Sequence, residues 1–419
     1  MIFTAQSPNT QKDDFRLALR ILLKPRSYLK GSYPFKLKKW FRDFFKVENI
    51  TLYDSARTAL YYCLKEMGVG SGDEVVIQAF TCIAAVNPIK WLKAKPVYVD
   101  IDKDSLSLDL DDLAEKINKN TKVIIVQHTF GYPAKIDKII KLAKTKNIKV
   151  IEDCAHTIGT EYKGVKLGKF GDAAIFSLGR DKAISGSFGG VLIANRNDLS
   201  EKLSKIEKGL KYPSKKWIAR QVFYTIISYV IRNFYDLLSI GRIIHFISLK
   251  SGIILKATTK GEKKKSSKPN HVMSQMPNAF AEVALNQLKK LSSFNSKRKE
   301  YTRIYLKSLK EMDLKEVTVP DIKLHEGKFL IRFPILVEDR EKLIEFASQN
   351  GVILGNWYDS PIAPKEVSLK NAGYIDGSCK SAERICKRIV NLPMHVNMEK
   401  EDALKVIEVI ESYYGDKNN

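Results

Sequence analysis

The sequence predicts an α/β protein with a mostly parallel sheet, on the basis of two observations. Residues 148–152 and 173–178 are short, apolar, β-branched runs without helical periodicity, as in strands that are buried on both faces. Between residues 75 and 144, further short apolar runs alternate with segments of helical periodicity. This alternation indicates parallel β-α-β units joined by right-handed crossovers.

The elements are expected in a regular order along the chain. Residues 1–48 form a basic arm with roughly helical spacing, and Pro25, Gly31 and Pro34 interrupt it, so two short helices are expected there. Residues 51–68 read as a strand end, a turn and a helix that begins near Ser55. Further strands are expected at residues 75–78, 96–100, 123–127 and 191–194, and helices at residues 83–92, 110–117 and 134–144.

The C-terminal part has a different pattern, which predicts a small α+β domain. Residues 276–309 have the period of one long helix, and residues 329–337 read as a strand. Helices are expected at residues 340–350 and 401–413.

The chain length also indicates more than one domain, because 419 residues exceed the size at which a single core keeps growing. We expect a basic arm at residues 1–48, a large domain at 49–300 that contains an insertion at 208–270, and a small domain at 301–419. Five cysteines without a CxxC pair, and a start without signal-peptide character, predict a reducing, cytoplasmic location.

The net charge of +24 is concentrated in two segments. Residues 208–268 carry fourteen Lys and Arg against two acidic residues, and residues 1–48 carry eleven against four. Such blocks indicate an anionic partner, either a phosphate-rich polymer or a membrane surface. Nothing in the sequence resembles a base-reading module, so a nucleic acid is not the expected partner.

The insertion is apolar and aromatic, but its longest uninterrupted run, residues 222–231, is about half of the roughly 20 residues that span a bilayer. One hypothesis is that residues 208–268 and the arm hold the protein peripherally on an anionic membrane face, with Trp217, Phe223, Tyr224 and Phe234 in the interface. The alternative is that these helices pack over the active site or a dimer contact. Residues 258–270, TTKGEKKKSSKPN, are expected to form a mobile polar loop.

Polar residues follow the strands at 148–152 and 173–178. Asp153, His156, Ser177 and Lys182 would all lie at the carboxyl edge of the sheet, where ligands bind in α/β proteins. A lysine there can form a Schiff base with an aldehyde cofactor, and a buried carboxylate can keep a pyridine nitrogen protonated. A surface lysine and a helix-capping aspartate are the alternative reading of these two residues.

The fuller pattern resembles the DegT/StrS family of sugar aminotransferases, which are fold-type I enzymes that use pyridoxal 5'-phosphate (PLP). The resemblance covers roughly residues 49–207 and 272–412. It implies a large domain with a mostly parallel seven-stranded sheet and a smaller C-terminal α+β domain. The matching segments are GDEVVIQAFT (72–81), KPVYVDID (95–102), VQHTFGYPAKID (126–137), EDCAHTIGTEYKG (152–164), GDAAIFSLGRDK (171–182) and FGGVLIAN (188–195).

The resemblance assigns the cofactor site residue by residue. Lys182 matches the lysine that forms the Schiff base, and Asp153 matches the partner of the pyridine nitrogen. His156 matches a position, commonly glutamine, that bonds the phenolic oxygen, and Ser177 matches a serine that donates to the phosphate. In the family, backbone N–H groups at a helix N-terminus hold the cofactor phosphate, because they are free to bind an anion. The residues that match this phosphate cradle are Ser55, Ala56 and Arg57. No metal ligand set is expected.

Two positions depart from the family pattern. Cys82 stands where relatives carry an aromatic residue that stacks on the PLP ring, so that Phe80 or a side chain elsewhere would supply the surface, or the ring would pack on a smaller group. Met273 stands where relatives often carry an asparagine that reaches the neighbour's phosphate, so that this contact is absent or comes from Asn270 or Arg57.

The resemblance also implies the reaction: transfer of an amino group from an amino acid, glutamate, to a keto-sugar carried on a nucleotide, for polysaccharide or glycoconjugate biosynthesis, in a homodimer. Residues that match substrate-facing segments are His128, Trp357, Tyr358 and His395, although such residues also serve in packing. Two alternatives stay open. One is another PLP reaction such as sugar dehydration, whose enzymes replace the lysine with histidine; the other is a non-enzymatic, regulatory, membrane-associated relative.

Overall fold

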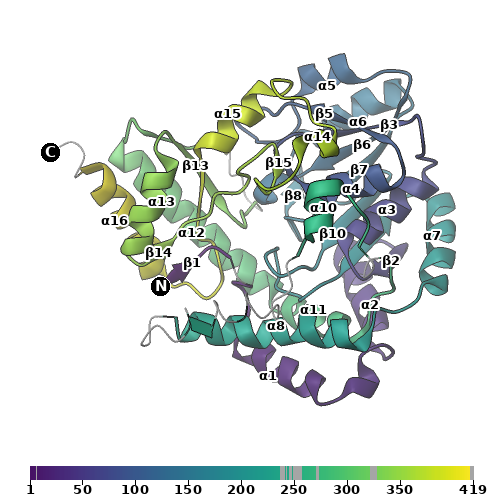
Figure 1. Ribbon diagram of the computed structural model, residues 1–419, viewed down its shortest axis with the longest axis horizontal. Helices are drawn as coiled ribbons and strands as arrows, with labels where there is room; N and C mark the ends of the chain where they lie inside the picture. Colours follow the sequence, from purple (N-terminus) through teal and green to yellow (C-terminus); the bar gives the residue numbers. More distant parts are fainter. Residues whose placement is uncertain are drawn as a thin grey trace.

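A seven-stranded sheet forms the centre of the larger part of the molecule (Figure 1). The computed structural model describes residues 1–5, 7–235, 257–269, 273–320 and 328–415, with residues 241, 243, 244 and 248. In this sheet β11 is antiparallel to both of its neighbours, and the other pairs are parallel. The mostly parallel α/β fold is therefore confirmed. In spatial order the strands are β2 (Ile50–Tyr53), β11 (Gly190–Ala194), β10 (Ala173–Ser177), β7 (Lys149–Asp153), β6 (Thr121–Gln127), β3 (Glu74–Gln78) and β5 (Lys95–Val99).

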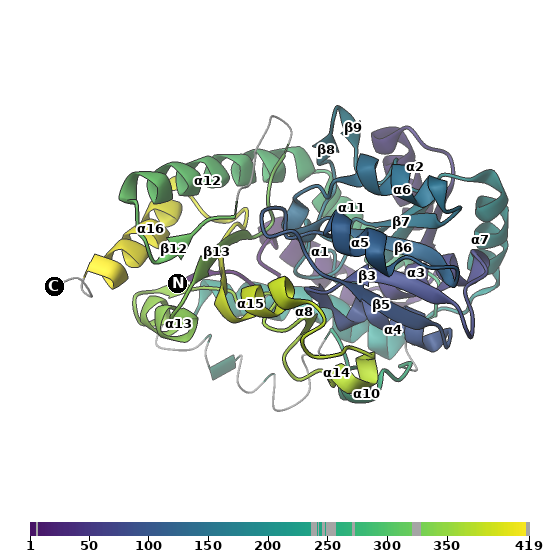
Figure 2. The same cartoon turned by 90° about the horizontal axis from the view of Figure 1, so that it is seen from above.

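Helices cover both faces of this sheet (Figure 2). On one face, Val75 and Ile77 of β3 join the apolar cluster of α3, α4 and α7. On the other face, Val76 joins the cluster of α5 and α6, and Phe176 of β10 packs against α2 and α11. Successive side chains of a strand point to opposite faces, which explains why the strands are continuous apolar runs. The helix bounds are α2 (Tyr33–Phe45), α3 (Ala56–Glu66), α4 (Ile83–Trp91), α5 (Leu110–Lys116), α6 (Ile136–Thr145), α7 (Asn197–Gly209) and α11 (Asn278–Leu288).

A three-stranded antiparallel sheet forms the smaller part, as the pattern of the C-terminal residues predicts. Phe333 and Ile335 of β13 pack in one apolar cluster with Val406 and Ile410 of α16. The domain boundary expected at residue 300 lies inside α12, so this division stays a prediction. The elements are α12 (Leu291–Met312), β12 (Val317–Thr318), β13 (Phe333–Val337), α13 (Arg340–Gln349), β14 (Val352–Ile353), β15 (Ile362–Ala363), α14 (Leu369–Ala372), α15 (Lys380–Arg388), β16 (Ile389–Leu392) and α16 (Lys400–Gly415).

Two expected elements differ from the structure. The helix expected at residues 276–309 is divided into α11 and α12, with Lys289 and Lys290 between them. The strand expected at residues 329–337 forms only over β13. The reason is that Ile331 N–H donates to Phe130 O, at 2.8 Å, which ties the preceding residues to the loop after β6 instead of to β16.

The N-terminal arm is part of the folded body. Its two expected helices are confirmed as α1 (Lys12–Leu22) and α2, with the short helix η1 (Pro25–Ser27) between them. Strand β1 (Ile2–Phe3) pairs in parallel with β14 of the smaller part. Helix α1 then packs against α8 and α11 (Figure 1). The arm therefore connects the smaller part to the larger one.

The insertion also packs inside the protein. In α8 (Lys215–Asn233), Ile218 and Val222 are fully buried. The ring of Trp217 contacts Phe280 at 5.5 Å between centroids, and Tyr224 lies under Arg180, at 3.6 Å from the guanidinium carbon to the ring centroid. These two aromatic side chains are used for internal packing, which corrects the hypothesis that they enter a membrane. Within the described ranges, every helix is too short or too polar to cross a bilayer.

Ile218→Ala tests the packing of α8. This substitution should lower the free energy of unfolding by about 2–4 kcal/mol, because it leaves a cavity beside α1 and α11. Lys216→Ala, at an exposed position of the same helix, should change it by less than about 0.5 kcal/mol. Chemical denaturation measures both variants. Wild-type stability of Ile218→Ala would contradict the packing described here.

Candidate active site

A cavity opens at the carboxyl edge of the sheet, and it collects most of the residues that the sequence singled out. Gln127, Asp153 and Ser177 are the last residues of β6, β7 and β10, so the strand ends bring them together. The loop after β10 adds Lys182, and the start of α3 closes another side. Of the predicted site residues, those that line this cavity are Ser55, Ala56, Arg57, Asp153, His156, Ser177, Lys182, Trp357 and Tyr358.

The amine of Lys182 lies 3.0 Å from His156 Nε2. The backbone N–H of Phe130 donates to His156 Nδ1, at 3.2 Å, so the neutral imidazole carries its proton on Nε2. Burial, and then the positive charges of Lys182 and Arg332, hold the pKa of His156 well below its usual range. A neutral Nε2–H needs an acceptor, and the Lys182 amine can accept only when it is unprotonated. Burial lowers the pKa of Lys182 and thus favours this form.

Asp153 is fixed at the end of β7, with its carboxylate in the same cavity. The backbone N–H of Ala155 donates to Oδ1 at 2.9 Å. The other carboxylate oxygen has no hydrogen-bond partner among the residues that the structure describes. Burial raises the pKa of Asp153, while the Ala155 N–H and the charge of Lys182 lower it. The carboxylate can therefore accept one further hydrogen bond from a cationic group in the cavity.

The N-terminus of α3 forms an anion cradle. Ser55 caps the helix and accepts from Thr58 N–H, whereas the N–H groups of Ala56 and Arg57 donate to no described residue. A Cβ at Gly190 would lie 2.3 Å from the backbone carbon of Ser55, so only glycine lets β11 approach this turn so closely. Free N–H groups and the helix dipole make such a turn suitable for a phosphate. Ser177 lines the cavity as well and offers a hydroxyl.

The sequence placed Arg57 in the phosphate site, but its side chain binds another part of the protein instead. Its guanidinium forms an ion pair with Glu262 of α10 (Lys260–Lys265), and both side chains are buried. Arg57 Nη2 also donates to Ala257 O at 3.0 Å. The side chain is thus held by the insertion, and its backbone N–H is the group left for the cradle. Residues 260–265, which we expected in a mobile loop, form a helix; the pattern from Thr259 to Glu262 is a capping box that could have indicated it.

Aromatic surface reaches the cavity from residues other than Phe80. Phe80 is fully buried, lies edge-on to Tyr358 and does not line the cavity. Cys82 does line it, beside Trp357, Tyr358 and Phe188. Phe80 is therefore not placed to stack on a ring in this cavity, and a side chain elsewhere or the smaller Cys82 stays as the predicted surface. Asn270 lies outside the described residues.

Two of the predicted substrate residues lie outside this cavity. His128 is fully buried: its Nε2 lies 3.2 Å from Glu152, and its Nδ1 accepts from Ala134 N–H at 3.2 Å. These contacts give His128 a structural role. His395 lines a separate small cavity on the other side of Lys182, and burial lowers its pKa to about 3.

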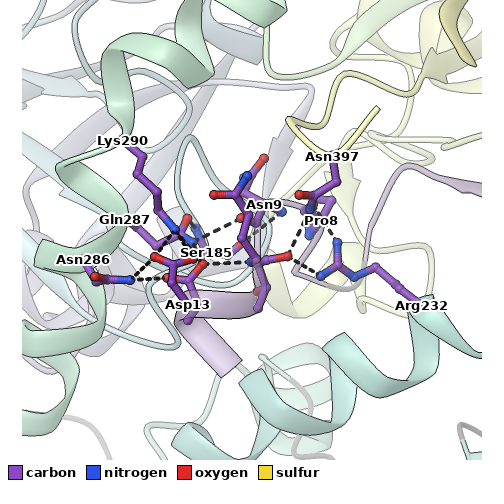
Figure 3. Close-up of polar contacts among 12 residues, drawn as sticks. Pro8, Asn9, Asp13, Ser185, Arg232, Asn286, Gln287, Lys290 and Asn397 are labelled. Carbon is purple, nitrogen blue, oxygen red and sulfur yellow. Dashed lines mark hydrogen bonds and ion pairs between the residues drawn. The ribbon is translucent and has the colours of Figure 1, made fainter. Parts of the chain in front are cut away.

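The N-terminal segment contacts the loop that carries Lys182 and holds it in place (Figure 3). The sequence did not predict this contact. Asn9 Nδ2 donates to the backbone oxygen of Lys182 at 3.1 Å, and Asn9 N–H donates to Ser185 Oγ at 3.3 Å. Arg232 of α8 donates to Pro8 O and Thr10 O, at 2.8 and 2.7 Å. The insertion, the arm and the lysine loop are therefore one connected structure.

Comparison with known proteins gives matches that cover most of the chain. A family model described as the DegT/DnrJ/EryC1/StrS aminotransferase family matches residues 9–225 and 252–411. The GDP-perosamine synthase of Escherichia coli O157:H7 is 26% identical over 389 residues, which are 93% of this chain and 92% of that protein.

Solved structures have the same fold. An aminotransferase from Psychrobacter cryohalolentis has a TM-score of 0.76 at 19% identity, with 98% of this chain and 99% of that chain covered. NtdA from Bacillus subtilis, solved with bound cofactor PMP, has a TM-score of 0.74 at 21% identity, with 98% of this chain and 84% of that chain covered.

The buried Arg57–Glu262 ion pair should contribute to the free energy of unfolding. Glu262→Gln should lower the free energy of unfolding by about 3–5 kcal/mol, because it leaves a buried guanidinium without a counter-ion. The double variant Arg57→Met, Glu262→Leu should recover most of that loss, since it removes both charges. Lys264→Gln, at an exposed position of the same helix, serves as the control in chemical denaturation. Equal stability of Glu262→Gln and wild type would show that the pair is not buried.

Proposed function

The chain belongs to the DegT/DnrJ/EryC1/StrS aminotransferase family, and on that basis we propose that it transfers an amino group from glutamate to a nucleotide-linked keto-sugar. It is a PLP-dependent sugar aminotransferase. The observation that carries the proposal is the convergence of the Lys182 amine, the His156 ring and the Asp153 carboxylate in one buried cavity beside a free helix N-terminus.

The residues present fit the cofactor. An unprotonated lysine amine suits its aldehyde, a carboxylate with an open oxygen suits a protonated pyridine nitrogen, and the first turn of α3 with Ser177 suits a phosphate. Gly190 leaves room for that turn where a Cβ would collide with it. When bound, PLP supplies the electron sink that stabilises the carbanion formed next to the transferred nitrogen.

The chain's own groups then handle the protons. Lys182, once free, is placed to take a proton from the donor carbon and to return one, because burial lowers the pKa of its amine and so favours the unprotonated form. His156 Nε2–H orients that amine, and Phe130 N–H fixes the imidazole tautomer. Asp153 holds the charge that stabilises a cationic ring nitrogen. Trp357 and Tyr358 line the cavity, and the Trp357 ring centroid lies 5.7 Å from the Lys182 amine.

Membership of the family does not name the sugar, and we propose a more specific substrate. One relative is named a GDP-perosamine synthase, so a GDP-linked keto-sugar is the first acceptor to consider, with a role in polysaccharide or glycoconjugate biosynthesis. A homodimer, a cytoplasmic location and a peripheral contact of the basic segments with an anionic membrane stay part of the proposal. Lysine at position 182 favours transfer over dehydration, since related dehydratases carry histidine there.

A panel of acceptors tests this proposal. The PLP-loaded protein with L-glutamate should convert one nucleotide-linked keto-sugar to an amino sugar, with stoichiometric 2-oxoglutarate, and GDP-linked sugars should give the highest kcat/KM. Mass spectrometry of the nucleotide sugars measures the product. Release of ammonia without amination would indicate a dehydratase, and no conversion of GDP-, UDP- or dTDP-linked keto-sugars would contradict the proposal.

A further inference from the structure

The loop that carries Lys182, residues 178–189, is held by other parts of the chain. It connects β10 to β11 and contains neither a helix nor a strand. Its two ends are tied to each other, because Leu178 N–H donates to Gly189 O at 2.9 Å. Residues 181–185 in its middle form no backbone–backbone hydrogen bond with any residue that the structure describes. The position of Lys182 therefore depends on side chains that reach the loop from outside.

Asn9 is the one described residue that bonds the backbone of Lys182. Its Nδ2 donates to Lys182 O at 3.1 Å, and its own N–H donates to Ser185 Oγ at 3.3 Å. Asn9 is 2% exposed, and it is not among the described residues that line the main cavity. Any effect of Asn9 on the reacting amine therefore passes through the backbone of the lysine.

The contacts of Asn9 fix the direction in which its carboxamide points. Arg298 Nη2 donates to Asn9 Oδ1 at 3.1 Å and to Ala183 O at 2.7 Å. A guanidinium can only donate and a backbone carbonyl can only accept, so Oδ1 must face Arg298 and Nδ2 must face Lys182. Gln287 Nε2 also donates to Asn9 O at 3.1 Å. The carboxamide thus joins α12 to Lys182 in a single orientation.

The residues on both sides of Asn9 are fixed by two further parts of the protein (Figure 3). Pro8 O and Thr10 O accept from Arg232 of α8, at 2.8 and 2.7 Å. The same two oxygens accept from Asn397 Nδ2, at 2.7 and 3.0 Å. Asn397 lies between β16 and α16 in the smaller part. The insertion and the smaller part thus both hold the segment that contacts Lys182.

We propose that Asn9 is a positioning residue for the reaction, and that it holds the Lys182 amine in place through Lys182 O. The amine lies 3.0 Å from His156 Nε2, and it has to reach both the aldehyde carbon of the cofactor and the donor carbon. A misplacement of about 1 Å can lower the rate of such a step about 100-fold. This role rests on the proposed function, in that Lys182 is taken as the reacting amine.

Schiff-base formation with PLP tests Asn9 without any sugar. In this step the Lys182 nitrogen adds to the aldehyde carbon, and water leaves. Asn9→Asp keeps the size of the side chain and an acceptor for Arg298, but it places an oxygen instead of an N–H group against Lys182 O. The rate constant of the absorbance change on adding PLP to the cofactor-free full chain should therefore fall about 10- to 100-fold.

A cofactor analogue without the aldehyde separates positioning from damage to the site. Pyridoxine 5'-phosphate has the ring and the phosphate but cannot condense with an amine. Its Kd, measured by calorimetry, should therefore change less than about twofold in Asn9→Asp. Asn286→Ala is the matched control, since Asn286 bonds Asp13 and Asp14 instead of the loop, and it should equal wild type in both measurements.

Asn397→Ala gives a second test from the smaller part. It removes one of the two donors to Pro8 O and Thr10 O without removing a contact of the loop itself. It should slow Schiff-base formation about 2- to 10-fold and leave the Kd of the analogue unchanged, because one buried hydrogen-bonding group is lost. This variant decides the test if Asn9→Asp does not fold.

Three results would overturn the proposal. They are a wild-type rate of Schiff-base formation in folded Asn9→Asp, an equal loss of analogue binding in that variant, and an equally slow reaction in Asn286→Ala. The acceptor panel plays no part in these measurements, so failure of the sugar reaction and failure of this role of Asn9 are distinguishable.

Discussion

The burial of one lysine amine governs the rest of this structure. The amine of Lys182 is normally charged, but here it lies in a cavity that lowers its pKa, 3.0 Å from the Nε2 atom of a histidine that is itself held neutral by burial. The arrangement works only if other groups fix the tautomer of His156 and the position of the lysine loop. Phe130 N–H does the first, and Asn9 does the second from the N-terminal segment.

The basic insertion is best understood as part of that support. Helix α8 supplies Arg232, which holds the backbone of Pro8 and Thr10, and α10 supplies Glu262, which holds Arg57 at the start of α3. The segments that carry most of the net charge thus place individual charged groups inside the protein. In the described part of the insertion, Lys215, Lys216 and Lys268 stay exposed.

The sequence predicted the sheet and the centre of the site well, for physical reasons. Strands buried on both faces must be continuous apolar runs, and polar residues directly after them must meet at one edge, as Asp153 and Ser177 do. It did not predict the partners of Arg57 or Asn9, because these depend on contacts between segments far apart in the chain. Glu262 was missed since its lysine-rich surroundings resemble a solvated loop, and His128 was misjudged because a buried histidine and a substrate histidine look alike in sequence.

The central claim is that Lys182, and no other lysine, reacts with the cofactor. Borohydride reduction of the PLP-incubated protein, followed by peptide mass mapping, measures this directly. We predict a single phosphopyridoxyl group on Lys182, and none in a folded Lys182→Ala variant, while exposed lysines such as Lys163 stay unmodified. Modification spread over surface lysines, or equal labelling of Lys182→Ala, would contradict the account.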